Sequence, residues 1–488
     1  MQYHSTREPQ TYVSASQAIH QGLSSEGGLF VPSEFPRVDW NELRSLDYPQ
    51  LAARILQQFL TDYSVEFLQE TTEKVYGAAF ENKAAALHPV APGLYSLELW
   101  HGPTCAFKDY ALQLMPHLLV EAKRNLGCPE ETLILVATSG DTGKAALAGY
   151  QDVPGVRIAV FYPNKGTSAI QRLQMTTQPG DNVSVYAVQG NFDDAQTGVK
   201  RVFADVAVNE ELKSRGVQLS SANSINWGRL APQIVYYFSA YLNLVEQGVV
   251  QPGAPVDFCV PTGNFGDILA GYYAKQMGLP VGKLVCASNK NDVLTEFLTT
   301  GTYNANREFY KTTSPSMDIL VSSNLERLLY HITGSAEAVS DWMKELARKG
   351  QYTVPDEVLA RIQQDFAAGC ADDVEAAAEL RNRWEQDGYL CDPHTAVAFK
   401  VAREYRARTG SDAPMVVLST ASPYKFPRDV LAALGVSAPA DEFQAMKQLE
   451  QQSGSPAPLA LSTLDQKPER FDQVIEPVEI ADVALGTK

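Results

Sequence analysis

Val256-Asp-Phe-Cys-Val-Pro-Thr-Gly-Asn-Phe-Gly-Asp267 is the stretch of this 488-residue sequence that most clearly indicates the fold. Its first part is an apolar run of strand length that ends at Pro261. A turn with two glycines follows, and a helical pattern opens near Asp267 and is stopped by Gly278. A buried strand, a short turn and a helix in this order form the repeating unit of α/β folds.

The same alternation is found on both sides of this stretch, from about Thr132 onward. Amphipathic helical patterns cover Asp193–Val208, Trp227–Gln247 and Asp267–Met277, and short apolar runs lie between them. Because strands joined by helical crossovers run side by side in the same direction, the pattern predicts an α/β fold with largely parallel sheets. We expect strands at Thr132–Ala137, Val156–Tyr162, Val183–Val188, Val217–Ser220, Val256–Pro261, Leu284–Ser288 and Met415–Ser419.

Three regions depart from this alternation. Residues 1–95 show helical patterns near Tyr48–Phe59 and Val65–Gly77, which predicts an N-terminal extension or cap domain. Residues 335–390 are rich in Glu, Asp, Ala, Lys and Arg at helical spacing, which predicts a helical insertion with a solvated, charged surface. The tail after Ser453 contains Pro, Ser and Gln, and we expect it to run over the surface without a core of its own.

The composition argues against several classes of protein. A net charge of −17 argues against nucleic acid as a partner, because phosphate binding needs a basic face. The six cysteines are scattered without a CxxC pair and the seven histidines without an HExxH motif, so we expect no metal site and reduced thiols. No apolar run reaches the length of a membrane span, and the polar N-terminus lacks a signal-peptide core. We therefore expect a cytoplasmic protein, with monomer and homodimer both open.

The turn after Pro261 is also a candidate anion-binding site. Gly263 and Gly266 lack side chains, so backbone N–H groups there can approach a ligand closely. The helix that begins at the turn adds unpaired N–H donors and the positive end of its dipole. The same residues also suit an ordinary strand-to-helix turn, so this stretch alone leaves both interpretations open.

Lys108, in His101-Gly-Pro-Thr-Cys-Ala-Phe-Lys-Asp109, is a candidate nucleophile or base. It follows the apolar run Cys105-Ala-Phe107, and an amine among apolar neighbours loses hydration, which lowers its pKa. A single lysine of this kind is more often a surface residue with a buried stem. Its own stretch therefore does not decide its role.

Two further loops follow predicted strands. Ala137-Thr-Ser-Gly-Asp-Thr-Gly-Lys144 offers small hydroxyl residues and two glycines, which can wrap a small carboxylate. It is not a nucleotide-binding loop, because Gly140 and Gly143 are too close together and Ala145 stands where Ser or Thr is needed. Leu418-Ser-Thr-Ala-Ser-Pro-Tyr-Lys425 delivers hydroxyl groups to the end of the last strand, where one can bind a ligand ring nitrogen.

Taken together and in this order, the four stretches resemble threonine synthase, a family of fold-type II pyridoxal-phosphate enzymes. The match rests on Phe107-Lys-Asp109, Ser139-Gly-Asp-Thr-Gly143 and Gly263-Asn-Phe-Gly-Asp267, a combination that chance would rarely produce. It extends from Gly22-Leu-Ser-Ser-Glu-Gly-Gly-Leu-Phe30 to Leu418–Lys425, and leaves out the charged helical segment and the tail.

The resemblance implies two open, twisted, largely parallel α/β domains with an N-terminal extension and a helical insertion. On this sequence, the extension or cap covers residues 1–95. A smaller domain covers 96–225 and carries Lys108 and the carboxylate loop. A larger cofactor-binding domain covers 226–488, with the insertion near 335–390.

The resemblance also implies pyridoxal 5'-phosphate as the cofactor. Lys108 would bind the cofactor aldehyde covalently, Phe107 would lie beside the ring, and Thr420 would meet the ring nitrogen. The cofactor phosphate would be held by the glycine turn, which comprises Gly263, Asn264, Phe265, Gly266 and Asp267.

For the substrate, the resemblance implies sites for a carboxylate and a phosphate. The phosphate would lie near Asn226, Arg229 and the Asn164–Arg172 stretch. A planar guanidinium suits phosphate, although a structural role for Arg229 in its helix is equally supported. The carboxylate would lie in the loop of Ser139, Gly140, Asp141 and Thr142.

The implied activity is that of a carbon–oxygen lyase acting on a phosphate ester. O-phosphohomoserine and water would give L-threonine and phosphate, a step of threonine biosynthesis. A threonine or serine dehydratase is an alternative, which would use the same lysine for β-elimination and would need no distal phosphate site. A non-catalytic homologue that binds pyridoxal phosphate is a second alternative, but it would not need Lys108, the glycine turn and Thr420 together.

Overall fold

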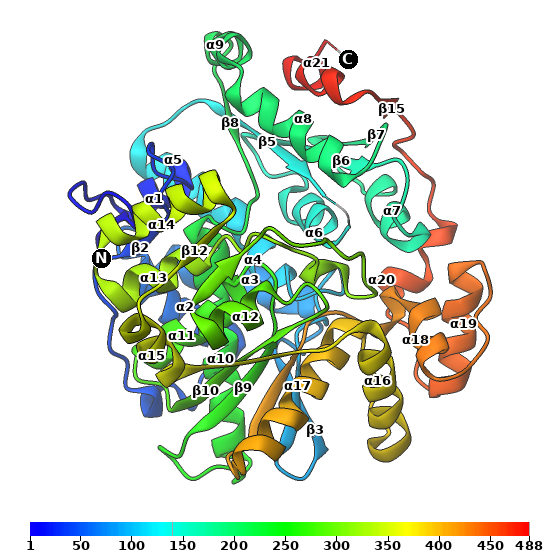
Figure 1. The fold of residues 1–488 in the computed structure, drawn as a ribbon. Coiled ribbons are helices and arrows are strands. Elements are labelled where there is room, and N and C mark those ends of the chain that lie inside the picture. Colours follow the sequence, from blue (N-terminus) through cyan, green and yellow to red (C-terminus); the bar gives the residue numbers. More distant parts are fainter. Residues whose placement is uncertain (139, 488) are drawn as a thin grey trace.

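The chain folds around two main sheets of mostly parallel strands, as the sequence predicts (Figure 1). The structure is a computed structural model that describes residues 1–138 and 140–487. The larger sheet has six strands in the order β13-β10-β9-β14-β4-β3, and all neighbours are parallel except β3 and β4. Its strands are β3 (Ala86–Ala91), β4 (Leu94–Glu98), β9 (Val256–Pro261), β10 (Val281–Ser288), β13 (Phe366–Cys370) and β14 (Met415–Ser419).

The smaller sheet has five parallel strands in the order β15-β7-β6-β5-β8. They are β5 (Glu131–Ala137), β6 (Val156–Pro163), β7 (Val183–Val188), β8 (Val217–Ser220) and β15 (Val474–Ile475). Two short antiparallel pairs complete the strands: β1 (Tyr3–Ser5) with β2 (Phe30–Pro32), and β11 (Thr302–Asn304) with β12 (Gln351–Thr353).

Helices pack against both sheets. The larger sheet is contacted by α11 and α17, and the smaller by α6 and α8. Among the described residues, no helix is both long enough and apolar enough to cross a membrane. The helices are α1 (Ala15–Gln21), α2 (Tyr48–Phe59), α3 (Val65–Tyr76), α4 (Asp109–Leu112), α5 (Met115–Leu126), α6 (Asp141–Tyr150), α7 (Ala169–Thr176), α8 (Phe192–Ala204), α9 (Val206–Ser214), α10 (Trp227–Glu246), α11 (Gly266–Gln276), α12 (Val293–Thr300), α13 (Leu325–Thr333), α14 (Ala336–Lys349), α15 (Asp356–Asp365), α16 (Asp373–Asp387), α17 (Pro393–Thr409), α18 (Pro427–Ala433), α19 (Glu442–Ser453), α20 (Leu459–Ser462) and α21 (Ile480–Leu485). Short 3-10 turns lie at Trp40–Leu43, Ala78–Phe80, Pro315–Met317, Pro423–Lys425, Leu464–Gln466 and Pro477–Glu479.

All seven predicted strands are present, and four of them, β7, β8, β9 and β14, have the predicted bounds. The single helix predicted over Asp193–Val208 is wrong, because the structure has two helices there. The first ends at Ala204, and Asp205 then caps α9 by accepting hydrogen bonds from the N–H groups of Ala207 and Val208. An aspartate at this position favours a new helix start over continuation.

Residues 335–390, predicted as a helical insertion, contain the helices α14, α15 and α16 and also the strands β12 and β13. β13 lies inside this region and pairs in parallel with β10 at the edge of the larger sheet. Its sequence, Phe366-Ala-Ala-Gly-Cys370, is small and short between two charged helices, so it gives no strand signal. The segment is therefore part of the sheet, while α14, α15 and α16 carry the charged residues.

The sheets also divide the chain differently from the predicted boundary at residue 96. β4 (Leu94–Glu98) crosses that boundary and pairs with β14 in the larger sheet, so the strand before Lys108 does not belong to the smaller sheet. The tail does more than run over the surface. β15 pairs with β7, and Ile475 and Ile480 enter the apolar cluster of the smaller sheet.

The N-terminal segment is tied to the glycine turn through Arg327, which is fully buried on α13. Its Nε donates to the carbonyl of Phe30 at 2.9 Å, and its two other nitrogens donate to Ile225 and Asn324. The N–H of Asn324 in turn donates to the carbonyl of Asn264, at 3.0 Å. One guanidinium therefore joins β2, the segment before α10 and the turn.

We expect Arg327→Met to destabilise the protein by roughly 3 to 5 kcal/mol, because buried acceptors on three segments lose their donor. Urea unfolding of the cofactor-free chain measures this loss. Arg54→Met, at an exposed position on α2, is the control and should change stability by less than about 0.5 kcal/mol. Equal stability of the two variants would contradict the structural role of Arg327.

Candidate active site

Lys108 lies in the loop that follows β4, and this loop is bonded to the loop that follows β14. The N–H of Phe107 donates to the carbonyl of Thr420 at 2.8 Å, and the N–H of Ser422 donates to the carbonyl of Cys105 at 3.1 Å. Because β4 and β14 are parallel neighbours, both loops leave the same end of the sheet. Two of the four predicted stretches are therefore side by side.

The side chain of Lys108 is mostly buried, with 12% of its surface exposed, and its amine lies among polar groups. Its Nζ donates to Oγ of Ser316 at 3.0 Å and lies 4.0 Å from a carboxylate oxygen of Asp141. The centroid of the Phe107 ring is 5.2 Å from the same nitrogen. Burial lowers the pKa of Lys108, and the charge of Asp141 offsets part of this effect. A neutral amine is the form that attacks an aldehyde or accepts a proton.

The glycine turn joins β9 to α11, as predicted. Phe265, at φ +64°, precedes the first turn of α11 and provides no side-chain cap, while Oδ1 of Asp267 accepts a hydrogen bond from the N–H of Ile268 at 2.9 Å. A methyl group at Gly263 would lie 2.6 Å from the backbone carbonyl of Ser316, so only glycine fits there. The positive dipole end of α11 and the backbone N–H groups of the turn before Ile268 fit a phosphate group.

Ser316 connects the lysine to the turn. Its hydroxyl binds Lys108, and its carbonyl lies against Gly263. The carboxylate of Asp267 is also close enough to Lys108 to act on its pKa. The lysine and the turn, far apart in sequence, therefore share one small site.

Asp267 gives this site a pH-dependent stability. Burial raises its pKa to about 7, and hydrogen bonds from backbone N–H groups, chiefly that of Ile268, offset part of the increase. Between about pH 4 and pH 7 the folded chain binds a proton that the unfolded chain has released. The contribution of Asp267 to stability therefore falls as pH rises through this range and is constant above it.

We expect Asp267→Asn to stabilise the cofactor-free chain at pH 8 by roughly 2 to 4 kcal/mol, because asparagine cannot ionise. The gain should disappear near pH 4. Urea unfolding at several pH values measures it, with the exposed Asp472→Asn as a control that should show no such trend. A gain that stayed constant from pH 4 to pH 8 would exclude ionisation of Asp267 as its cause.

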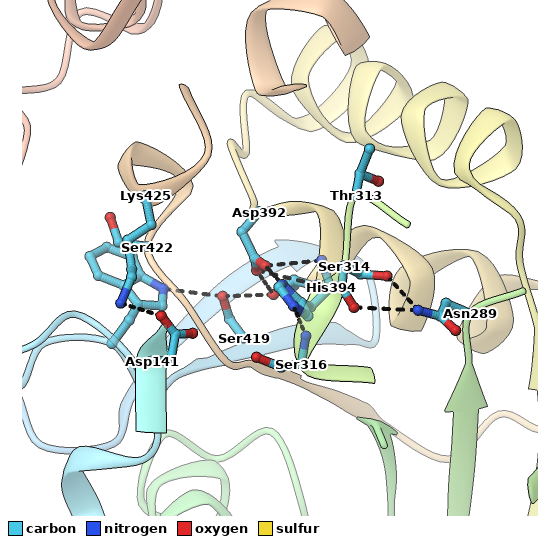
Figure 2. Close-up of polar contacts among 12 residues, drawn as sticks. Asp141, Asn289, Thr313, Ser314, Ser316, Asp392, His394, Ser419, Ser422 and Lys425 are labelled. Carbon is cyan, nitrogen blue, oxygen red and sulfur yellow. Dashed lines mark hydrogen bonds and ion pairs between the residues drawn. The ribbon is translucent and has the colours of Figure 1, made fainter. Parts of the chain in front are cut away.

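Asp141 begins α6, and its side chain is engaged by two lysines. Its Oδ1 lies 2.6 Å from Nζ of Lys425 (Figure 2), which also donates to the carbonyl of Thr104 at 3.0 Å. Burial alone would raise the pKa of Asp141, but the charges of Lys425 and Lys108 outweigh burial and hold the pKa below its ordinary value. An ionised carboxylate repels another carboxylate, so this side chain itself is unsuited to the predicted substrate contact.

The rest of the predicted carboxylate loop offers its backbone. The hydroxyl of Thr138 accepts from the N–H groups of Gly140 and Gly143 at 3.0 Å each, which leaves the N–H groups of Asp141 and Thr142 as candidate donors at the start of α6. Ser139 lies outside the described residues. Binding of a substrate carboxylate by this loop stays a prediction.

Asn226 and Arg229, the two residues predicted near the substrate phosphate, differ in how many of their polar groups already have hydrogen-bond partners. Asn226 caps α10 by accepting from Gly228 N–H at 2.8 Å, and its amide donates to the carbonyl of Ile19 at 2.8 Å. Arg229 is buried and donates to the carbonyl of Ala222, but among the described residues its Nε has no hydrogen-bond partner. Burial lowers the pKa of Arg229 to about 10. Its charge acts on Lys108, so it lies near the site.

The contacts of Arg172 do not support a substrate-phosphate site in the Asn164–Arg172 stretch. Arg172 forms an ion pair with Glu469 of the tail, so its guanidinium is already matched by a carboxylate. Thr176, on the same helix, also donates to Glu469, at 2.9 Å. These contacts fix α7 against the tail.

Four residues of the site are not predicted from the sequence: Ser316, Asp392, His394 and Lys425. Nε2 of His394 accepts from the N–H of Ser316 at 3.1 Å, and Nδ1 contacts Asp392 at 2.6 Å (Figure 2). The sequence Asp392-Pro-His carries one usable signal, since an aspartate followed by proline is typical of a helix start. Ser316 has no comparable signal.

Comparisons with known proteins agree with this geometry. Three family descriptions match in succession: threonine synthase N terminus over residues 2–76, pyridoxal-phosphate dependent enzyme over 84–360, and threonine synthase C-terminal over 395–483. Threonine synthase from Pseudomonas aeruginosa is 40% identical over 450 residues, which cover 90% of this chain and 92% of that protein. Human threonine synthase-like 1 is 40% identical over 436 residues, which cover 86% of this chain but 58% of that longer protein.

Two solved structures share the whole fold. The pyridoxal-phosphate-bound threonine synthase from Brucella melitensis superposes with a TM-score of 0.89 at 38% identity, covering 100% of this chain and 99% of that one. Yeast threonine synthase gives a TM-score of 0.89 at 33% identity, covering 99% and 98%. The chain therefore belongs to the threonine synthase family, within the pyridoxal-phosphate-dependent enzymes of fold type II.

Proposed function

We propose that this chain binds pyridoxal 5'-phosphate and converts O-phosphohomoserine and water into L-threonine and phosphate. The observation that carries the proposal is the position of Ser316, which accepts a hydrogen bond from Lys108 and lies against Gly263. Ser316 thereby places the amine of Lys108, which suits an aldehyde, close to the glycine turn, which suits a phosphate. Membership of the family supports the same reaction.

When bound, pyridoxal phosphate supplies an aldehyde that links to amines and a ring that takes up electrons from an adjacent carbon. The glycine turn, Gly263 to Asp267, would hold its phosphate, and Phe107 would lie beside its ring. Thr420 would face the ring nitrogen. Because a threonine hydroxyl is neutral, it would bind this nitrogen without supplying a negative charge that holds a proton there.

Lys108 would carry out the proton transfers at its Nζ. Once the substrate amine has taken its place, the freed lysine amine removes the α-proton and later returns a proton. Burial favours the neutral form needed for the first step, and Asp141 stabilises the charged form that results. Loss of a β-proton, departure of phosphate from Cγ, protonation of Cγ, addition of water at Cβ and return of a proton to Cα would complete the conversion.

Arg229 would bind the substrate phosphate. No carboxylate among the described residues pairs with this buried guanidinium, which is costly to keep in a protein, and a bound anion would offset that cost. Such a group favours a substrate with a distal phosphate over the unphosphorylated substrates of a dehydratase. The N–H groups at the start of α6 would bind the substrate carboxylate.

Phosphate release from O-phosphohomoserine, with and without added pyridoxal phosphate, tests this function. We expect cofactor-dependent release with an equal amount of threonine formed. Oxoacid formation from threonine or serine in place of that reaction would establish the dehydratase alternative. Cofactor binding without turnover of any hydroxy or phospho amino acid would establish the non-catalytic alternative.

The proposal also includes the cellular compartment, the partner and the domain division of the protein. We place it in the cytoplasm, since all six cysteines are free thiols and four of them are buried. Its partner would be the small-molecule substrate, and light scattering decides between monomer and homodimer. The division into an extension, a smaller domain and a larger cofactor-binding domain also stays a proposal, with β4 assigned to the larger one.

A further inference from the structure

The segment from Thr312 to Asp318, here named the covering loop, lies over the glycine turn and against Lys108. At its centre, two polar groups of Ser316 are hydrogen-bonded and its carbonyl packs against the glycine turn. The hydroxyl accepts from Lys108 at 3.0 Å, the N–H donates to His394 at 3.1 Å, and the carbonyl lies against Gly263. A small displacement of Ser316 would therefore change the surroundings of the lysine and of the turn together.

The contact with His394 fixes the tautomer of this histidine. A backbone N–H can only donate, so Nε2 of His394 must be the unprotonated acceptor. The proton is then on Nδ1, which donates to Asp392 at 2.6 Å. Asp392 is fully buried at the start of α17, where the N–H groups of His394 and Thr395 also donate to it. The acceptor that holds Ser316 is thus rigid.

The other side of the covering loop is held independently. The amide of Asn289, which follows β10, donates to Ser314 Oγ at 3.0 Å (Figure 2) and also to Asp318 at 2.7 Å. Thr313 donates through its N–H and its hydroxyl to Asp373, at 3.1 and 3.0 Å. The loop would therefore keep its general course without His394, whereas the orientation of Ser316 depends on it.

We propose that Ser316 holds the amine of Lys108 whenever this amine is free of the cofactor, and that His394, oriented by Asp392, is the positioning residue that keeps Ser316 in place. The inference rests on the proposed function, in which each turnover frees the lysine amine and uses it as a base. A hydroxyl acceptor directs the amine across the glycine turn and limits its other orientations. No bond is made or broken at Ser316.

The test compares two pairs of variants in the full-length protein. Ser316→Ala removes the acceptor for Lys108, and Ser316→Thr retains a hydroxyl. His394→Leu removes the acceptor for the N–H of Ser316, and His394→Gln retains an amide oxygen that can accept it. The first readout is the rate at which acetic anhydride acetylates Lys108 in the cofactor-free chain, followed by mass spectrometry. The second is kcat and KM for O-phosphohomoserine with the cofactor bound.

We expect Ser316→Ala and His394→Leu to raise the acetylation rate of Lys108 roughly fivefold or more, since the amine loses its fixed partner. Both should lower kcat roughly tenfold to a hundredfold, with a smaller effect on KM. Ser316→Thr and His394→Gln should restore most of both properties. If His394→Leu does not fold, the Ser316 pair still tests the contact, because its side chain faces Lys108.

Wild-type acetylation of Lys108 in Ser316→Ala would overturn the role of Ser316. Equal impairment of His394→Gln and His394→Leu would show that His394 has only a structural role. It would overturn the proposal that His394 positions Ser316. Failure of the proposed function gives a different result: no variant and no wild-type protein would convert O-phosphohomoserine, while acetylation in the cofactor-free chain would still report on the Ser316 contact.

Discussion

Lys108→Ala is expected to abolish threonine formation, with a loss of at least about ten-thousandfold in turnover. The proposed mechanism uses this amine to hold the cofactor and to move protons in several steps, and no substitute lies on the same loop. The variant should also lose the yellow absorption of the lysine-bound cofactor while its thermal unfolding stays cooperative. Phosphate release and visible absorption after dialysis measure these effects.

Lys144→Met is the matched control for this experiment. Its amine binds Gln178 and not Ser316, although it belongs to the neighbouring helix α6. It should retain the yellow absorption after dialysis. Unaltered absorption in Lys108→Ala would show that a different lysine binds the cofactor, and the assignment of Lys108 would fall.

Gly263→Ala should weaken cofactor binding by at least about a hundredfold, which corresponds to roughly 2.7 kcal/mol. The added methyl group would meet the carbonyl of Ser316 at 2.6 Å, so either the turn or the covering loop must shift. Overpacking of this kind also destabilises a folded chain by about 1 to 3 kcal/mol. Titration with pyridoxal phosphate and urea unfolding of the cofactor-free chain measure the two effects separately.

Gly266→Ala is the control that distinguishes a steric clash at Gly263 from a general sensitivity of the glycine turn to substitution by alanine. Its methyl group would lie 3.5 Å from Asn324 and 3.7 Å from Gln233, which are ordinary contact distances. In the cofactor-free chain it should change stability by less than about 0.5 kcal/mol. A Gly266→Ala chain as unstable as Gly263→Ala would contradict the crowding that the structure shows at Gly263.

The sequence predicts well what is encoded locally. The strand Val256–Pro261, the turn after it and α11 each carry their own signal of apolar run, glycine and helical period. The order of four such stretches was enough to suggest the family, which the comparisons show. The structure brings Lys108 and the glycine turn together through Ser316.

What the sequence could not predict depends on contacts between distant segments. Ser316, His394 and Lys425 come from separate parts of the chain, and each has an ordinary local context. The direction of the Asp141 side chain follows from the buried charge of Lys425, which no periodicity reveals. β13 was missed for a similar reason, since only its position beside β10 makes it a strand.

The position of β14 between β9 and β4 has a consequence for biosynthesis on the ribosome. Until residues 415–419 have been translated, the strands that precede the lysine and the turn have no common neighbour, and the middle of the sheet is open. Each half exposes an unpaired edge during that interval, which invites mispairing or capture by chaperones. The chain should therefore become competent to bind its cofactor only late in synthesis, when this central strand inserts.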